Sequence, residues 1–189
     1  GDGLADLLVS APGRARGGAD AGFVYVLHGP LDQAGSLGSA PQRIRGAFAA
    51  DRAGSAVASV GDATGDGIPD LLVGAWGHDG GGDEAGCAWL LPGPLVGTVD
   101  LRIDGFPLLG ERAGDRFGVA VAGADLDGDG VSDLIVGALE DERGGAGAAL
   151  VFYGPLDRGL SAGDADLRLA GELAGDRAGF ALAIAPLEG

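Results

Sequence analysis

The side chains most suited to chemistry in this sequence are aspartates that crowd into one short loop. They occupy its first, third, fifth and ninth positions around a glycine at the sixth, as Asp125, Asp127, Asp129, Asp133 and Gly130. Ca²⁺ binds roughly six to eight oxygen ligands in flexible geometry, and a tight loop supplies them from alternate side chains and a backbone carbonyl. The spacing therefore predicts a calcium site to which Val131, at the seventh position, contributes its carbonyl oxygen. A solvated acidic turn is the alternative, but four metal-free carboxylates at this spacing repel one another.

The same spacing recurs in the middle of the chain and begins again at its N-terminus. The middle copy replaces the second acid by a hydroxyl, so its predicted ligands are Asp62, Thr64, Asp66, Ile68 and Asp70. A hydroxyl or a water can stand in for one carboxylate at lower affinity. The N-terminal copy is only the second half of a loop, with Asp2, Leu4 and Asp6 as predicted ligands. Its other ligands would precede Gly1, which favours a piece of a larger polypeptide.

The residues after each loop distinguish it from an EF-hand. An EF-hand needs a bidentate Glu at its twelfth position and a helix on each side, whereas the twelfth residue here is Val136 or, in the middle copy, Val73. The ninth aspartate is followed at once by an apolar run, Leu134–Val136 or Leu71–Val73. Runs of this length and type indicate a buried strand. Each predicted calcium loop thus leads into a β-strand.

Glycine spacing indicates the secondary-structure class. The chain has 189 residues, 40 of them glycine, and no glycine-free run exceeds nine residues. A typical helix needs about 11 to 12 residues and tolerates interior glycine poorly. The spacing predicts short strands joined by tight turns, and it argues against a dockerin-like module, whose acidic loop requires helices.

Charge and composition limit the partners. The net charge is -16, from 28 acidic residues against 12 arginines and no lysine, so nucleic acid and anionic membranes would be repelled and a cation is the expected ligand. The sequence has no segment long enough to insert into a membrane. A hydrophobic content of 46% suffices for one core. The lone Cys87 forms no intrachain disulfide and is predicted to be a buried thiol.

Two further landmarks repeat with the loops and define three units of about 63 residues, at about 1–61, 62–124 and 125–189. One landmark is a Gly-Pro pair, at Gly29-Pro30, Gly93-Pro94 and Gly154-Pro155. The other is an Asp-Arg pair, at Asp51-Arg52, Asp115-Arg116 and Asp176-Arg177. Because the Asp-Arg pair occurs in every unit, we interpret it as a structural turn, in which the Asp caps the turn and the Arg ties neighbouring units.

Each unit is predicted to hold four antiparallel strands, which we name A to D. In the third unit they are expected at 118–123, 133–138, 148–153 and 167–170, and a further strand of type A at Phe180–Ala185. Alternating strand direction places the A–B calcium loops and the C–D connections on one face and the variable B–C loops on the other. Four short strands per repeat, stacked radially, form a blade of a β-propeller.

The combination of loop and landmarks resembles the FG-GAP repeats of the integrin α-subunit propeller and related bacterial secreted proteins. Phe117-Gly118 carries the FG, and the residues that carry most of the GAP are Val73–Ala75, Val136–Ala138 and Ala11-Pro12. The FG phenylalanine is replaced by Ala53 and Ala178 in the other units. The resemblance implies an all-β fold, here a partial β-propeller, because the family's propeller has seven blades. The rest of that propeller, or a second copy of which Phe180–Ala185 completes the first blade, would then close the ring.

The function expected from these features is a calcium-stabilised, non-enzymatic binding or adhesion module at the cell surface or secreted, presenting loops to a protein or glycan. Recognition is expected on the B–C loops, at 13–16, 76–79 and 140–143, with Trp76 as the first candidate contact residue. The alternative is the accessory propeller of a secreted hydrolase or lyase. Catalysis within the chain has little support, because His28 and His78 belong to no recognisable motif and are interpreted as surface residues.

Overall fold

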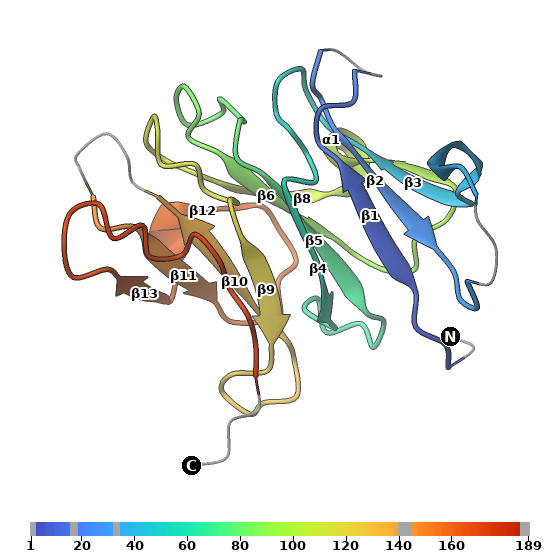
Figure 1. Cartoon of the computed structure of the whole chain (residues 1–189). Coiled ribbons are helices and arrows are strands. Elements are labelled where there is room, and N and C mark those ends of the chain that lie inside the picture. Colours follow the sequence, from blue (N-terminus) through green and yellow to red (C-terminus); the bar gives the residue numbers. More distant parts are fainter. Residues whose placement is uncertain (1–2, 16–18, 32–34, 140–144, 186–189) are drawn as a thin grey trace.

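The computed structural model describes residues 3–15, 19–31, 35–139 and 145–185. Within this part of the chain the strands form three sheets that lie side by side in chain order, from β1 at one end of the molecule to β13 at the other (Figure 1). The main strands of each sheet form one blade, and consecutive strands of a blade are antiparallel. The chain is a partial β-propeller, as the sequence predicted.

Blade 1 consists of β1 (Leu7–Ala11), β2 (Phe23–Leu27) and β3 (Gln42–Arg45). Blade 2 consists of β4 (Ala56–Gly61), β5 (Asp70–Ala75), β6 (Cys87–Leu91) and β8 (Phe106–Leu109). Blade 3 consists of β9 (Val121–Ala124), β10 (Asp133–Ala138), β11 (Ala148–Phe152) and β13 (Leu167–Ala170). The C–D connections carry the short elements η1 (Leu37–Ser39), β7 (Thr98–Asp100), α1 (Leu101–Asp104), β12 (Leu160–Ser161) and η3 (Ala162–Asp164).

The predicted strands of the third unit agree with β10 and β13, and β11 ends one residue early. Strand A begins at Val121 rather than at Gly118, because Gly118 has a φ of +88° and belongs to the preceding turn. The prediction of a strand at Phe180–Ala185 is wrong: this segment has no strand partner within the described residues, so its backbone joins no ladder. Its Leu182 nevertheless packs against Ala122 and Ile135 of blade 3.

Two short strands that the sequence did not predict join neighbouring blades. β7, from the C–D connection of blade 2, pairs in parallel with β3 of blade 1. β12, from the C–D connection of blade 3, pairs in parallel with β8 of blade 2. The outer strand of each of the first two blades is therefore covered by the connection that belongs to the next blade.

The core lies between blades. Successive residues of a strand point to opposite faces, so β5 directs Leu72 toward blade 3, where it belongs to one apolar cluster with Leu134. The next residue, Val73, points the other way and belongs to a second cluster with Ile44 of blade 1. Both faces of the middle blade are thereby buried, which explains its near-continuous apolar strands.

The glycine of the repeated Val-Gly-Ala sequence is explained by close backbone approach. A Cβ added to Gly74 would overlap the carbonyl oxygen of Gly118, and one added to Gly137 would overlap that of Gly179. The turn that opens each following blade thus lies directly against strand B of the blade before it, and only glycine leaves room for it.

Replacing the FG phenylalanine is expected to destabilise the fold. Phe117 is fully buried and packs edge-on against Phe152, with ring centroids 6.2 Å apart. Phe117→Ala should lower the free energy of unfolding by about 3 to 5 kcal/mol, measured by urea denaturation. The exposed Val96→Ala is the control and should change it by less than about 0.5 kcal/mol. A loss below about 1 kcal/mol for Phe117→Ala would show that this ring does not hold blades 2 and 3 together.

Candidate metal centre

The third acidic loop, between β9 and β10, brings three carboxylates together. One side-chain oxygen each of Asp125, Asp127 and Asp133 lies within 4.8 Å of the other two. Among the described residues, no other group of three acidic, histidine or cysteine side chains is gathered in this way. A donor set made only of oxygens suits a hard divalent cation such as Ca²⁺ or Mg²⁺. The residues present therefore fit a metal site.

Hydrogen bonds within the loop hold its first carboxylate in place. Asp125 accepts from the amides of Gly128, at 2.7 Å, and Gly130, at 3.0 Å. Both glycines have positive φ, +85° and +90°, which lets the chain curl around this side chain. Asp129, predicted as a ligand, accepts instead from the amide of Val131 at 2.8 Å and lies outside the group of three.

The ninth-position aspartate is buried and connects the loop to the Gly-Pro turn after strand C. Asp133 is 1% exposed, and its two oxygens accept from the amides of Leu126, at 2.7 Å, and Gly154, at 3.0 Å. In the middle loop Asp70 bonds the amides of Ala63, Thr64 and Gly93 in the same way, at 2.9 to 3.0 Å. The aspartate and the Gly-Pro landmark therefore recur together because they are bonded to each other.

The middle loop is folded alike but does not gather its acids. Asp62 accepts from the amides of Gly65, Asp66 and Gly67. The hydroxyl oxygen of Thr64 is buried without a hydrogen-bond partner, and a buried polar atom of this kind is costly unless something binds it. The two loops also touch, since the Ser132 amide donates to the Asp62 carbonyl at 2.8 Å.

Only part of the N-terminal half-loop can be described, because Asp2 lies outside the described residues. Leu4 and Asp6 are exposed. Asp6 bonds the Gly29 amide at 3.2 Å, which repeats the contact of Asp70 and Asp133 with the Gly-Pro turn. The His28 ring, 3.2 Å from Asp6, is the larger cause of a pKa lowered below the usual value of this carboxyl, followed by the Gly29 amide.

The Asp-Arg pairs are structural turns, as predicted. Asp51 accepts from the Phe48 amide, and Asp176 accepts from the amides of Glu172 and Leu173. Arg116 donates through Nε and Nη2 to one oxygen of Glu84, at 3.0 and 2.9 Å. Because Glu84 belongs to the B–C loop of blade 2, this arginine ties that loop to the turn that leads into blade 3.

Trp76 lies on the B–C face, and its ring contacts two of these arginines. The guanidinium carbon of Arg52 is 4.2 Å from the ring centroid, and that of Arg116 is 5.3 Å away. The side chain is partly buried. Trp76 thus braces two successive D–A turns through cation–π contacts. Of the other predicted recognition loops, residues 13–15 are described, whereas Arg16 and 140–143 lie outside the described residues.

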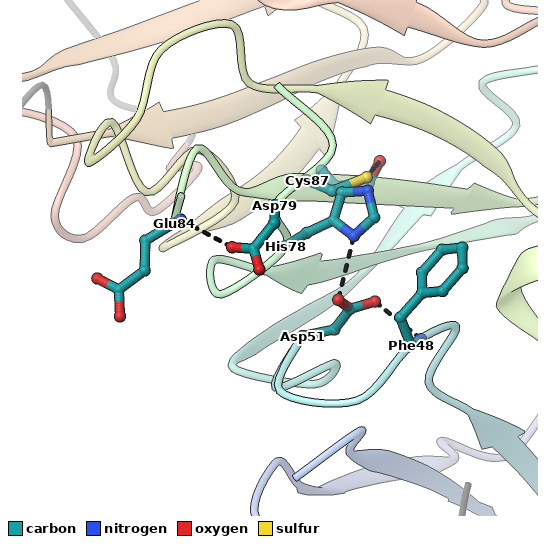
Figure 2. A network of polar contacts seen from close by, with 7 residues as sticks. Phe48, Asp51, His78, Asp79, Glu84 and Cys87 are labelled. Atoms are coloured by element: carbon teal, nitrogen blue, oxygen red, sulfur yellow. Dashed lines mark hydrogen bonds and ion pairs between the residues drawn. The ribbon is translucent and has the colours of Figure 1, made fainter. Parts of the chain in front are cut away.

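His78 is buried, so its interpretation as a surface residue is wrong. Its Nδ1 lies 3.1 Å from Asp51, its ring packs 5.4 Å from the Phe48 ring, and the residue is 8% exposed (Figure 2). No local pattern indicates this burial, because the partner of His78, Asp51, is 27 residues away. His28, by contrast, is exposed, as expected.

Cys87, beside His78 in Figure 2, is fully buried, as predicted. Burial first, and the charge of Asp51 second, raise the pKa of its thiol well above the usual value. A cysteine nucleophile needs an accessible thiol of lowered pKa, so the Asp51–His78–Cys87 group is part of the packing between blades 1 and 2.

The fold and the site together define a class of repeat protein, a β-propeller in which the turns between strands A and B are acidic loops. Comparison with known proteins identifies the family within this class. A model of the FG-GAP repeat matches residues 1–27 and 117–152. The chain belongs to the FG-GAP repeat family, in its integrin α-like form.

Curated relatives include integrin alpha-5 of Xenopus laevis, 35% identical over 81% of this chain and 14% of its own length. Integrin alpha-PS2 of Drosophila melanogaster is 32% identical over 76% of this chain and 11% of its length. Integrin alpha-6 of Gallus gallus is 37% identical over 74% of this chain and 12% of its length. The chain thus spans only a small part of these relatives. No helix among its described residues has the length and apolarity needed to cross a bilayer.

The buried and exposed aspartates of the third loop are expected to differ in their effect on stability. Measured by urea denaturation in EDTA, Asp133→Ala should cost roughly 2 to 3 kcal/mol, because it leaves two backbone amides without their acceptor. Asp127→Ala, in the same loop but exposed, should cost less than about 1 kcal/mol. Equal losses for the two variants would contradict a structural role for the ninth-position carboxylate.

Proposed function

We propose that this chain is a calcium-stabilised, non-enzymatic binding module of the adhesion type. The observation that carries the proposal is the gathering of Asp125, Asp127 and Asp133 within one loop. These carboxylates would hold the ion, joined by Asp129 and the Val131 carbonyl after a small shift of the exposed part of the loop. Bound Ca²⁺ would offset the repulsion among the acids, and so stabilise the turn.

The middle loop is proposed as a second and weaker site. Asp62, Thr64, Asp66, Asp70 and the Ile68 carbonyl would be its ligands, and the unpartnered Thr64 hydroxyl supports this assignment. Asp2, Leu4 and Asp6 are proposed to contribute to a third site when the preceding half of that loop is supplied. Binding at such modules is typically weak, with dissociation constants of about 10⁻⁴ to 10⁻³ M, which suits calcium levels outside the cell.

Recognition is proposed for the B–C face, with a protein or glycan as the ligand. Its loops stand on blades held together by Trp76, Arg116 and the Asp51–His78 pair, and binding residues are often found on loops positioned by a rigid scaffold. The similarity to integrin alpha chains supports an adhesion role and a place at the cell surface or outside the cell. The three units would act within one propeller segment, completed by further blades.

Calcium is expected to stabilise the protein to a small but measurable extent. At 1 mM Ca²⁺ each occupied site should add roughly 0.4 to 1.4 kcal/mol, or about 1 to 5 °C in melting temperature, relative to EDTA. The measurement is differential scanning calorimetry with and without CaCl₂, together with calcium titration by isothermal calorimetry. Asp125→Asn/Asp127→Asn should abolish binding at the third loop. Asp157→Asn, at an exposed acid outside the acidic loops, is the control for the loss of a surface carboxylate, and a melting temperature insensitive to calcium would refute the proposal.

The recognition half of the proposal has a separate test. The chain, immobilised in 1 mM CaCl₂, is presented with panels of purified matrix proteins and glycans and read by biolayer interferometry. Asp83→Ala, at an exposed tip of the B–C face, should weaken a bound ligand at least about threefold, whereas Asp157→Asn on the opposite face should not. Absence of binding across the panels, or equal loss in both variants, would contradict recognition by this face.

A further inference from the structure

The middle acidic loop, between β4 and β5, packs directly against blade 3. β4 bulges at Val60, which is skipped in the pairing with β5. Val60 is 1% exposed, and a Cβ added to Gly123 of blade 3 would lie 2.4 Å from that of Val60. Just after the bulge, the Asp62 carbonyl accepts a hydrogen bond from the Ser132 amide at 2.8 Å. The first residue of the middle loop is therefore bonded to the third loop.

The peptide between Val131 and Ser132 has a part in both loops. Its carbonyl, from Val131, is the proposed seventh-position ligand of the third loop, and its amide, from Ser132, is the donor to Asp62. A peptide group is planar and almost rigid. When the Val131 carbonyl is held as a ligand, the direction of the Ser132 amide is therefore held with it.

A second peptide carries the connection further into the middle loop. The Asp62 carbonyl and the Ala63 amide belong to one peptide, and this amide donates to Oδ2 of Asp70 at 2.9 Å. Asp70 is the proposed ninth-position ligand of the middle loop, and Ala63 is fully buried. Two peptides and two hydrogen bonds thus run from a proposed ligand of one site to a proposed ligand of the other. Hydrogen bonds in such a chain strengthen one another.

The middle loop itself shows that its own folding does not need this connection. Pro69 occupies its eighth position, as Ser132 does in the third loop, and proline has no amide hydrogen to donate. Asp70 nevertheless keeps its bonds to the amides of Ala63 and Gly93, each at 2.9 Å. A proline at the eighth position is therefore compatible with the internal bonds of an acidic loop.

We propose that the middle and third loops bind calcium with positive cooperativity, connected by the Val131–Ser132 and Asp62–Ala63 peptides. The inference rests on the proposed calcium function and adds the regulation of its two sites. Fixing the exposed part of either loop costs conformational entropy. A loop whose neighbour already holds one of its peptides in place loses less entropy on binding, so each occupied loop raises the affinity of the other.

The test is a titration with CaCl₂ in about 0.15 M KCl, followed by ¹⁵N nuclear magnetic resonance so that each loop is read separately. The Gly67 amide, bonded to the first carboxylate of the middle loop, reports on that loop. Asp125→Asn/Asp127→Asn disables the third loop. The middle loop should then bind calcium at least about fivefold more weakly than in the unaltered chain.

Ser132→Pro removes the connecting donor and is the decisive background. In it, Asp125→Asn/Asp127→Asn should change the calcium dissociation constant of the middle loop by less than about twofold. Ser132→Ala keeps the amide and is the matched control, in which the weakening of about fivefold should persist. The two lost charges are the same in every background, so the comparison isolates the hydrogen bond. Equal weakening with proline and with alanine at this position, or two loops that bind independently, would overturn this inference and leave the proposed function standing. Loops that bind no calcium would overturn both.

A second readout does not depend on the proline variant. In Asp62→Asn/Asp66→Asn only the third loop binds calcium, and its affinity should fall by the same factor of about five. Calcium should still shift the resonance of the Ala63 amide and slow its hydrogen exchange, because the chain of bonds ends there. The Phe48 amide, bonded to Asp51 in a D–A turn, is the control and should not respond. An Ala63 amide that is equally unresponsive would contradict the connection.

Discussion

The buried carboxylate at the ninth position of the acidic loops is the interaction on which the rest of the structure depends. In Asp133 one oxygen holds the start of the loop and the other holds the Gly-Pro turn after strand C. A single side chain thus sets where the loop curls, where strand B begins and where strand C ends. Burying a carboxylate costs free energy unless it accepts hydrogen bonds. The backbone amides that donate to this aspartate supply those bonds, and the aspartate in turn is their acceptor. Asp70 makes the same contacts in the middle loop, where the acids are not gathered, so the buried carboxylate positions the loop but does not by itself bring its acids together.

Much of the fold could be predicted because strands B, C and D are apolar runs bounded by glycine and the landmarks. The starting residue of strand A could not, since only the left-handed conformation of Gly118 shows that the turn continues to that point. β7 and β12 could not be predicted either, because they are short and their partners lie on another blade. The sequence of Phe180–Ala185 is typical of a strand. A strand forms a ladder only beside a neighbouring strand, and a sequence pattern does not reveal whether one is present.

The site was predictable to a similar degree. Spacing alone identified Asp125, Asp127 and Asp133, but it treated Asp129 as their equal, although the carboxylate of Asp129 lies outside the group of three. The middle loop has almost the same sequence, yet its acids are not gathered. The burial of His78 depends on Asp51, which the sequence identified only as part of a turn. Local spacing thus identifies the oxygen donors, whereas only the folded loop shows which of them converge.

The parallel pairing of β3 with β7 has a consequence for synthesis on the ribosome. β3 ends at Arg45 and the strand that covers it begins at Thr98, so blade 1 emerges with an open outer edge. At roughly 5 to 20 residues per second, several seconds pass before the covering segment is made. During that interval the edge can pair with another nascent chain, and neighbouring ribosomes on one message would bring such chains close together. Pairing of β7 with β3 closes this edge once residues 98–100 have been made.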